Sequence, residues 1–282
     1  RLCSAMAPAD ALSDPLLENR HRAEAYVRVF RIKDVIGLPI FVVWYLLLAW
    51  AVQREPIHSD LLGEPPPLWN YALQAFLFVS SIYPLYTQMI LPPPMPGEDF
   101  FALMAYISRW IFLTRHGLAL QSIHFGLSLL ATCTAWPELL RLTSAMTIWV
   151  GTLGWFVTVQ FFALVWPKPD FRERCRQALL KTPPVDLMWK SVVMHVPGLV
   201  LACADVTLAK DRRTLMESCS VANSTALVTF YIPFYVFLLV ANHHLTGQWP
   251  YSVLLKLTTL GHWAMFIAAQ WCLLMIFVFI MA

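Results

Sequence analysis

The chain has few charged residues, and this shortage decides its class. Only 13% of its 282 residues are Asp, Glu, Lys or Arg, whereas 59% are hydrophobic. Because a soluble globular domain is about a quarter charged, the composition excludes a soluble protein. It predicts an all-α, polytopic membrane helix bundle. The net charge of +3 is small and spread over the loops, so nothing indicates a nucleic-acid partner.

Paired cysteines are also missing. The six cysteines are scattered along the chain and none belongs to a C-x-x-C pair. This pattern argues against a zinc or redox site. No stretch has the composition of a soluble domain, so the function has to reside in the membrane helices and the loops that join them.

Seven apolar stretches have about the 20-residue length that crosses a hydrocarbon core. They lie at residues 35–53, 68–91, 108–134, 143–166, 186–206, 224–245 and 257–281. Prolines at 65–67 and 92–96 isolate the second stretch, because proline removes a backbone donor and blocks helix continuation. Asn223 and Ser224 are predicted to cap the sixth helix.

The chain divides into three parts. Residues 1–34 are predicted to form a polar, amphipathic arm whose second half lies on the membrane as an interfacial helix. Residues 35–67 supply an additional first membrane helix and a loop, and residues 68–282 form a six-helix membrane domain. The arm and the loop after the fourth span are rich in Lys and Arg, which places the N-terminus on the cytosolic or matrix side. The chain begins with Arg1 rather than Met, as expected after removal of an organellar presequence.

The third span holds an unusual number of polar groups: Thr114, Arg115, His116, Gln121 and His124. An ionisable group in hydrocarbon costs roughly 2.5 kcal/mol or more unless it faces protein or a wet cavity. Several such groups in one span therefore indicate that some of them are functional.

Polar residues from three spans are predicted to converge in one half of the membrane. Thr114 lies in the first half of the third span, and His195 lies about 13 Å into the fifth at 1.5 Å per residue. The sixth span returns to the same side and ends at His243 and His244. A hydroxyl and one or more imidazoles are thus expected at similar depth.

This set of groups permits acyl transfer. A threonine hydroxyl needs a base such as histidine to take its proton, and the histidine can return that proton to a leaving alcohol. Backbone N–H groups, Arg115 or another histidine can stabilise the oxyanion. Asp205 lies ten residues after His195 on the same helix, which is too far to orient it.

A structural interpretation stays open for each of these residues. A threonine within a span commonly bonds the carbonyl one turn back, and this applies to Thr114. His195 can serve as an interhelical hydrogen-bonding group instead of a base. His243 and His244 lie close to the membrane interface, where a hydrated structural role is the default.

Three sequence blocks, in order and spacing, resemble the family of androgen-induced and androgen-dependent tissue-factor-pathway-inhibitor-regulating proteins. The matching positions are Trp110, Phe112, Leu113, Thr114, Leu118, Gln121, Phe125 and Gly126; Trp189, Met194, His195 and Asp205; and His243, His244, Thr246, Gly247, Trp249 and Tyr251. The resemblance covers about residues 70–280. Known members are multipass hydrolases of fatty acid esters of hydroxy fatty acids. It implies a Thr114 nucleophile and a His195 base, with no metal or organic cofactor.

The chain departs from the family pattern close to the implied catalytic residues. Val192 replaces a histidine, Val196 and Pro197 replace threonines, and Gly117 replaces an acid. Residues beside the reacting groups orient them, so these changes affect turnover more than fold.

Two interpretations follow, and the sequence leaves enzymatic activity open. In the first, the protein hydrolyses lipid esters delivered from the membrane, and His243, His244, Arg115 and His116 support the Thr114–His195 pair. In the second, it is an accessory structural subunit of a large complex, such as a respiratory or ATP synthase complex of the mitochondrial inner membrane. The alternative membrane is the endoplasmic reticulum. A transporter ranks last, because neither broken helices nor repeats are evident.

Overall fold

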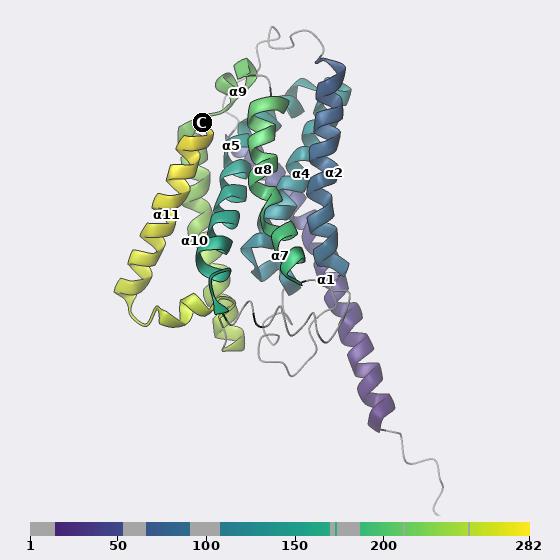
Figure 1. Ribbon diagram of the computed structural model, residues 1–282, viewed down its shortest axis with the longest axis vertical. Coiled ribbons are helices and arrows are strands. Elements are labelled where there is room, and N and C mark those ends of the chain that lie inside the picture. Colours follow the sequence, from purple (N-terminus) through teal and green to yellow (C-terminus); the bar gives the residue numbers. More distant parts are fainter. Residues whose placement is uncertain are drawn as a thin grey trace, which may run out of the picture.

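A computed structural model describes residues 15–52, 66–90, 108–169, 173, 187–210, 212–247 and 249–282. All regular elements in these ranges are helical, which confirms the predicted all-α bundle (Figure 1). In chain order they are α1 (Pro15–Val52), α2 (Leu68–Ile90), the 3₁₀ turn η3 (Ser108–Ile111), α4 (Leu113–Thr134), α5 (Pro137–Gln160), the π-helical turn η4 (Phe161–Val165), α7 (Leu187–His195), α8 (Pro197–Ala204), the π-helical turn η5 (Asp205–Ala209), α9 (Arg212–Ser218), α10 (Val221–Thr246), the 3₁₀ turn η6 (Ser252–Lys256) and α11 (Leu260–Met281).

Six helical segments of the described residues are long and apolar enough to cross a membrane. They are Val35–Val52, Leu113–Thr134, Pro137–Val165, Ser191–Ala209, Val221–Leu245 and Leu260–Met281. The remaining predicted span, α2, has a comparable length of 23 residues but is not among these six. Its buried polar side chains include Asn70, Gln74 and Thr87.

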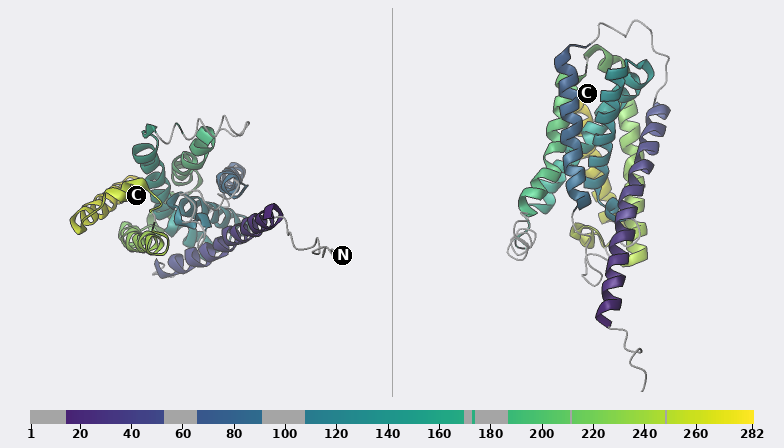
Figure 2. Two further views of the ribbon diagram at one scale, coloured as in Figure 1. Left: turned by 90° about the horizontal axis from the view of Figure 1, so that it is seen from below. Right: turned by 90° about the vertical axis from the view of Figure 1, so that its right-hand side faces the viewer.

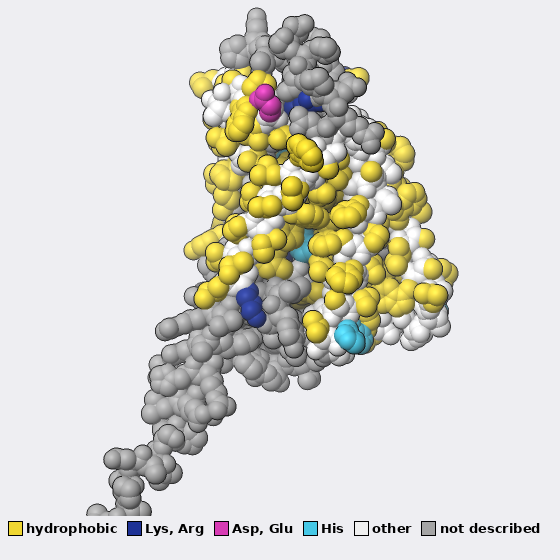
Figure 3. Space-filling model, turned by 180° about the vertical axis from the view of Figure 1, so that it is seen from behind, with side chains coloured by type: hydrophobic (Ala, Val, Ile, Leu, Met, Phe, Trp, Pro, Cys, Tyr) yellow, Lys and Arg dark blue, Asp and Glu magenta, His cyan; other side chains and the backbone are white. Residues whose placement is uncertain are grey.

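The exterior of the bundle is suited to lipid. In Figure 3, hydrophobic side chains cover most of the described surface of one face, and the few visible charged side chains lie near its ends. Large apolar side chains such as Phe237, Met265 and Phe279 are about two-thirds exposed, at 67%, 66% and 66%. Water would disfavour such a surface, whereas hydrocarbon would not. The protein is therefore a multipass membrane protein.

Helices α4 and α5 form the centre of the bundle. In their spans, 67% and 61% of the most apolar window is buried, compared with at most 33% in each of the other four. Helix α4 packs against α2 and α5, while α5 also contacts α8, α10 and α11. Viewed from below, the other helices surround this pair (Figure 2).

The N-terminal helix α1 is continuous over 38 residues. It contains the predicted first span, at Val35–Val52, and runs without a break through the preceding residues 15–34. The reason is local: residues 15–34 are rich in Leu, Glu, Arg and Ala, which favour helix. The first turns of α1 extend below the other helices, whereas α11 ends at the opposite end of the bundle (Figures 1 and 2).

The start of α10 differs from the prediction. The helix begins at Val221, and the Ser220 hydroxyl caps it by accepting a hydrogen bond from the N–H of Asn223. Asn223 is therefore inside the helix, and its side chain donates to the carbonyl of Val52 at 3.0 Å. This bond ties α10 to the end of α1.

Two glycines allow α5 and α8 to cross at close range. A Cβ on Gly154 would lie 2.5 Å from the Gly198 carbonyl oxygen and 2.2 Å from Gln121 Nε2. Gln121 donates to that same carbonyl at 2.7 Å, which adds α4 to the contact. Small residues let helix backbones approach within membranes, and this crossing holds α7 and α8 against α5.

Candidate functional site

The first turn of α4 and the end of α7 bring a hydroxyl and an imidazole together. Thr114 Oγ1 lies 3.0 Å from His195 Nε2, although the residues are 81 positions apart. Both side chains are half-buried, so they are partly shielded from solvent and still accessible. The distance is within the range expected between a nucleophile and its base.

The hydrogen bonds of His195 determine which ring nitrogen is protonated. His195 Nδ1 lies 2.6 Å from the carbonyl oxygen of Ser191. A carbonyl can only accept, so Nδ1 carries the proton and donates it. Nε2 of the neutral ring is then an acceptor directed at the Thr114 hydroxyl, as a general base requires.

The imidazole is also fixed by stacking. The ring of Phe161, in η4 at the end of α5, lies with its centroid 3.7 Å from that of His195 and is tilted by 10°. The π-helical turn at η4 positions Phe161 for this contact. Stacking and the Ser191 hydrogen bond together leave the imidazole little freedom to rotate.

The fifth span is interrupted directly after His195. Val196 keeps helical backbone angles, but Pro197 has no backbone N–H, and Leu199 N bonds the carbonyl of Val196 instead of that of His195. Thr158 of α5 donates its hydroxyl to the His195 carbonyl. No pattern in the chain predicts that Thr158 provides this donor.

A chain of phenols holds the start of α4. The N–H of Leu113 donates to Tyr251 Oη at 3.0 Å, Tyr251 donates to Tyr235 Oη at 3.0 Å, and Tyr235 donates to the Ile111 carbonyl at 2.9 Å. Burial raises the pKa of Tyr251, which therefore stays neutral. Thr114 follows as the second residue of α4, at the positive end of the helix.

Comparison with known families decides the relationship of this chain. A model of the family described as FAR-17a/AIG1-like protein matches residues 71–282. The chain belongs to the FAR-17a/AIG1-like family. The androgen-induced relationship implied by its sequence blocks is thereby confirmed. No curated protein matches the chain, and no solved structure matches it. Helix α1 lies outside the matched residues, so we refer to residues 71–282 as the family domain.

Two predicted supporting residues of the family domain point away from the Thr114–His195 pair. The guanidinium of Arg115 lies 4.9 Å above the Trp110 ring, and its Nη1 is 3.5 Å from the carbonyl of Leu85. His116 donates through Nε2 to the Trp110 carbonyl at 2.5 Å and accepts through Nδ1 from Tyr231 at 2.9 Å. Both residues stabilise the entry into α4.

The two C-terminal histidines are also apart from the pair in the contacts of the described residues. His244 is exposed, whereas the ring of His243 packs edge-on against Trp249 at 4.1 Å. The sequence block that contains these two histidines also contains Tyr251, whose hydroxyl accepts a hydrogen bond from Leu113 N at the start of α4. The resemblance includes that tyrosine, but residue spacing gave no sign of its hydrogen bond to Leu113.

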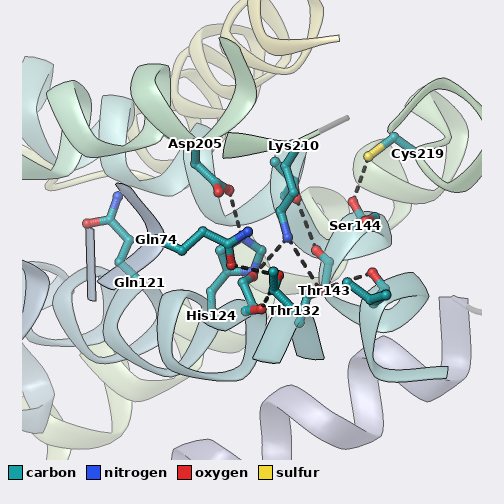
Figure 4. Close-up of polar contacts among 12 residues, drawn as sticks. Gln74, Gln121, His124, Thr132, Thr143, Ser144, Asp205, Lys210 and Cys219 are labelled. Carbon is teal, nitrogen blue, oxygen red and sulfur yellow. Dashed lines mark hydrogen bonds and ion pairs between the residues drawn. The ribbon is translucent and has the colours of Figure 1, made fainter. Parts of the chain in front are cut away.

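A second buried polar cluster lies deeper in the bundle. His124 donates through Nε2 to Asp205 at 2.9 Å and accepts from the Tyr45 hydroxyl at 2.8 Å. Asp205 is thus a partner of His124, in line with its predicted distance from His195. Lys210 donates to Ser128 at 2.8 Å. Asp205 and Lys210 project together toward α4 and α5 (Figure 4).

The deeper cluster is too enclosed to take part in chemistry and has a structural role. Burial lowers the pKa of Lys210, and the nearby Asp205 carboxylate opposes this by favouring the charged form. Asp205, His124 and Tyr45 are at most 2% exposed. A substrate cannot reach groups this deeply enclosed, so the half-buried Thr114–His195 pair is the better candidate for chemistry.

Proposed function

We propose that this protein is a membrane-embedded hydrolase of lipid esters, with Thr114 as nucleophile and His195 as base and then acid. Its substrate class would be the fatty acid esters of hydroxy fatty acids that known relatives cleave. The observation that carries the proposal is the 3.0 Å approach of Thr114 Oγ1 to His195 Nε2. Orientation of the ring by the Ser191 carbonyl supports it.

The first half of the reaction forms an acyl-threonine. His195 Nε2 takes the hydroxyl proton as Thr114 Oγ1 attacks the ester carbonyl carbon. The tetrahedral intermediate then collapses, the ester C–O bond breaks, and His195 returns the proton to the departing alkoxide. A hydroxy fatty acid leaves, and the other fatty acyl group stays on Thr114.

The second half uses water in place of the alcohol. His195 takes a proton from water, the resulting hydroxide attacks the acyl-threonine, and the proton returns to Thr114 as the fatty acid leaves. Amides in the first turn of a helix lack intrahelical acceptors. The N–H of Thr114 lies in that turn and is the nearest candidate donor to the oxyanion.

The base lacks a carboxylate partner among the described contacts of its ring. A carbonyl such as that of Ser191 fixes the tautomer, but it stabilises a positively charged imidazolium less than a carboxylate does. We therefore expect slower turnover than in an enzyme with a complete Thr-His-Asp arrangement. The replacement of polar family residues by Val192 and Val196 points in the same direction.

Labelling with a fluorophosphonate probe tests the proposal. Purified wild-type protein should react, while Thr114→Ala and His195→Ala should each lose the label. Thr134→Ala is a matched control, because Thr134 also lies in α4 but only bonds the carbonyl of Leu130. Label that persists in both site variants, with all proteins eluting as folded particles, would exclude this mechanism.

An accessory role in a larger assembly is the second candidate. It is favoured by α1, which is outside the family match and whose first turns extend beyond the bundle (Figure 2). Such a projecting helix is suited to contact a neighbouring subunit. Native electrophoresis of gently solubilised membranes should place the protein in a much larger complex, in the mitochondrial inner membrane or the endoplasmic reticulum. Migration as a monomer would contradict this role.

A further inference from the structure

The reaction proposed for Thr114 places a positive charge on His195. When Nε2 takes a proton from a hydroxyl or from water, the ring becomes an imidazolium. Among the described residues, the ring contacts the Thr114 hydroxyl through Nε2, the Ser191 carbonyl through Nδ1 and the ring of Phe161 through its face. None of these three groups carries a negative charge. The face of Phe161 is therefore the candidate for stabilising the cation.

The stacking geometry suits a charged imidazole better than a neutral one. The ring centroids of Phe161 and His195 lie 3.7 Å apart, and the ring planes are tilted by 10°. Because carbon atoms in contact are already about 3.5 Å apart, the two rings overlap almost face to face. Neutral aromatic rings prefer an offset or edge-on arrangement, since their electron-rich faces repel each other. A cation over such a face is attracted to it, so this arrangement favours the imidazolium.

The surroundings of Phe161 strengthen this attraction. The side chain is only 4% exposed, and its ring packs against Phe162 at 5.1 Å and Trp166 at 5.8 Å, both at steep angles. These contacts keep the face of Phe161 directed at His195. An attraction between a cation and an aromatic face corresponds to about fivefold in an equilibrium at an exposed site and to about thirtyfold where water is excluded.

We propose that Phe161 stabilises the imidazolium of His195 through the face of its ring, and so supplies part of what a carboxylate supplies in a catalytic triad. This inference rests on the proposed function and identifies the residue that supports its base. Phe161 acts through His195 and takes no part in bond making or breaking, so it is a positioning residue. Because the attraction grows only as the imidazole gains charge, it should raise kcat and leave KM unchanged.

Fluorinated phenylalanines test the electrostatics of the ring while nearly preserving its shape, because fluorine withdraws electrons from the ring face. Phe161 in the full chain is replaced by monofluoro-, difluoro- and pentafluorophenylalanine through stop-codon suppression. We expect fluorophosphonate labelling and ester hydrolysis to slow stepwise along this series, by about 5- to 30-fold at pentafluorophenylalanine, with KM unchanged. The same replacements at Phe162, whose described ring contacts are with Phe161 and Trp166, are the matched control and should leave both rates unchanged.

A spectroscopic measurement detects the charge on the imidazole without catalysis. The histidines are isotope-labelled, and the ring nitrogen signals of His195 are assigned by their loss in His195→Gln. At a pH where the wild-type ring is partly protonated, the charged fraction should decrease stepwise along the Phe161 series. The Phe162 series should not change it.

The outcomes separate the two proposals. Equal rates along the Phe161 series, in a protein that is labelled at Thr114, would overturn the role of Phe161 and leave the mechanism standing. A wild-type protein that neither labels nor hydrolyses would contradict the proposed function, and the ring nitrogen signals would then decide whether Phe161 stabilises the cation. Equal losses in the Phe161 and Phe162 series would assign the effect to altered packing and would also overturn the inference.

Discussion

At the scale of single residues, the site depends on the position of one proton. The Ser191 carbonyl accepts from His195 Nδ1 at 2.6 Å, which leaves Nε2 as the acceptor facing Thr114. Phe161 fixes the ring plane from one face. A hydroxyl at position 114 is therefore the feature on which the proposed chemistry depends.

Replacing Thr114 by serine and by valine isolates that hydroxyl. Thr114→Ser keeps a nucleophilic oxygen and should retain hydrolysis to within about tenfold of wild type. Thr114→Val keeps the shape but should lower kcat by at least about 10³-fold, as expected for loss of a nucleophile. Release of fatty acid from a synthetic ester measures both. Equal activity of the two variants would show that the hydroxyl is not the nucleophile.

Tyr251→Phe tests how α4 is held at its first turn. The change leaves the N–H of Leu113 without its acceptor, so we expect a loss of about 1–3 kcal/mol in the free energy of unfolding. Tyr83→Phe, at a side chain that is 57% exposed, should change stability little. Thermal denaturation in detergent measures both variants, and equal melting temperatures would contradict the assignment.

The same tyrosine predicts a dependence on pH. Burial raises the pKa of Tyr251 above its ordinary value of 10.0, so the folded protein favours the neutral phenol. The unfolded chain loses this proton first as pH rises. The contribution of Tyr251 to stability should thus be constant below pH 10 and fall above it, and Tyr251→Phe should lack this part of the decline. If the difference in melting temperature between wild type and Tyr251→Phe is the same below and above pH 10, the prediction is contradicted.

At the scale of elements, helix crossings place the histidine. The α5–α8 contact permits no side chain at Gly154, because a Cβ there would meet the backbone carbonyl of Gly198 at 2.5 Å. The interruption at Pro197 then frees the His195 carbonyl for Thr158. Helix α7 is therefore held at a defined distance from α5 and from the start of α4.

Gly154→Ala should disrupt this crossing. Overpacking of a backbone contact costs about 1–3 kcal/mol, and displacement of α8 should also reduce probe labelling of Thr114. Gly261→Ala in α11 is the control, since its Cβ would meet only Thr259 Oγ1, at 3.8 Å. Melting temperature and labelling are measured together. A fully stable, fully labelled Gly154→Ala protein would show that the crossing is not required.

Some of these features could be predicted from sequence, and others could not. Apolar length and polar spacing predict the helices and bring Thr114 and His195 to similar depth. The catalytic roles of these two residues stay predictions. The acceptor of the His195 ring is the backbone of Ser191, and Phe161 comes from another helix, so no pattern in the chain predicts either contact. Because His116 lies two residues after Thr114, the sequence favoured it over Tyr251 as a supporting residue of the site. In the structure, His116 bonds Trp110 and Tyr231 instead.

At the scale of the whole molecule, helix α1 forms part of the core although it lies outside the family match. Phe41 of α1 stacks on Trp110 at 4.5 Å, and the fully buried Tyr45 donates to His124 at 2.8 Å. His124 in turn donates to Asp205. Helix α1 is therefore joined to the family domain by aromatic packing and by a buried hydrogen-bonded chain.

Tyr45→Phe should weaken the attachment of α1 to the family domain. The change leaves His124 Nδ1 buried without its donor, which costs about 1–3 kcal/mol. Hydrogen exchange of residues 35–52 should become faster, while exchange in α11 should be unchanged. Tyr86→Phe, at a position that is 56% exposed, is the control. Identical exchange in α1 of wild type and Tyr45→Phe would argue that packing alone retains the helix.

The central claim is that Thr114 becomes acylated by a lipid ester, and peptide mass spectrometry tests it most directly. The protein is mixed with a synthetic fatty acid ester of a hydroxy fatty acid, quenched in acid within one turnover and digested. We predict a fatty acyl mass increment on Thr114, absent from Thr114→Ala and strongly reduced in His195→Ala. Hydrolysis without acylation of Thr114, or with the acyl group on another residue, would contradict the account.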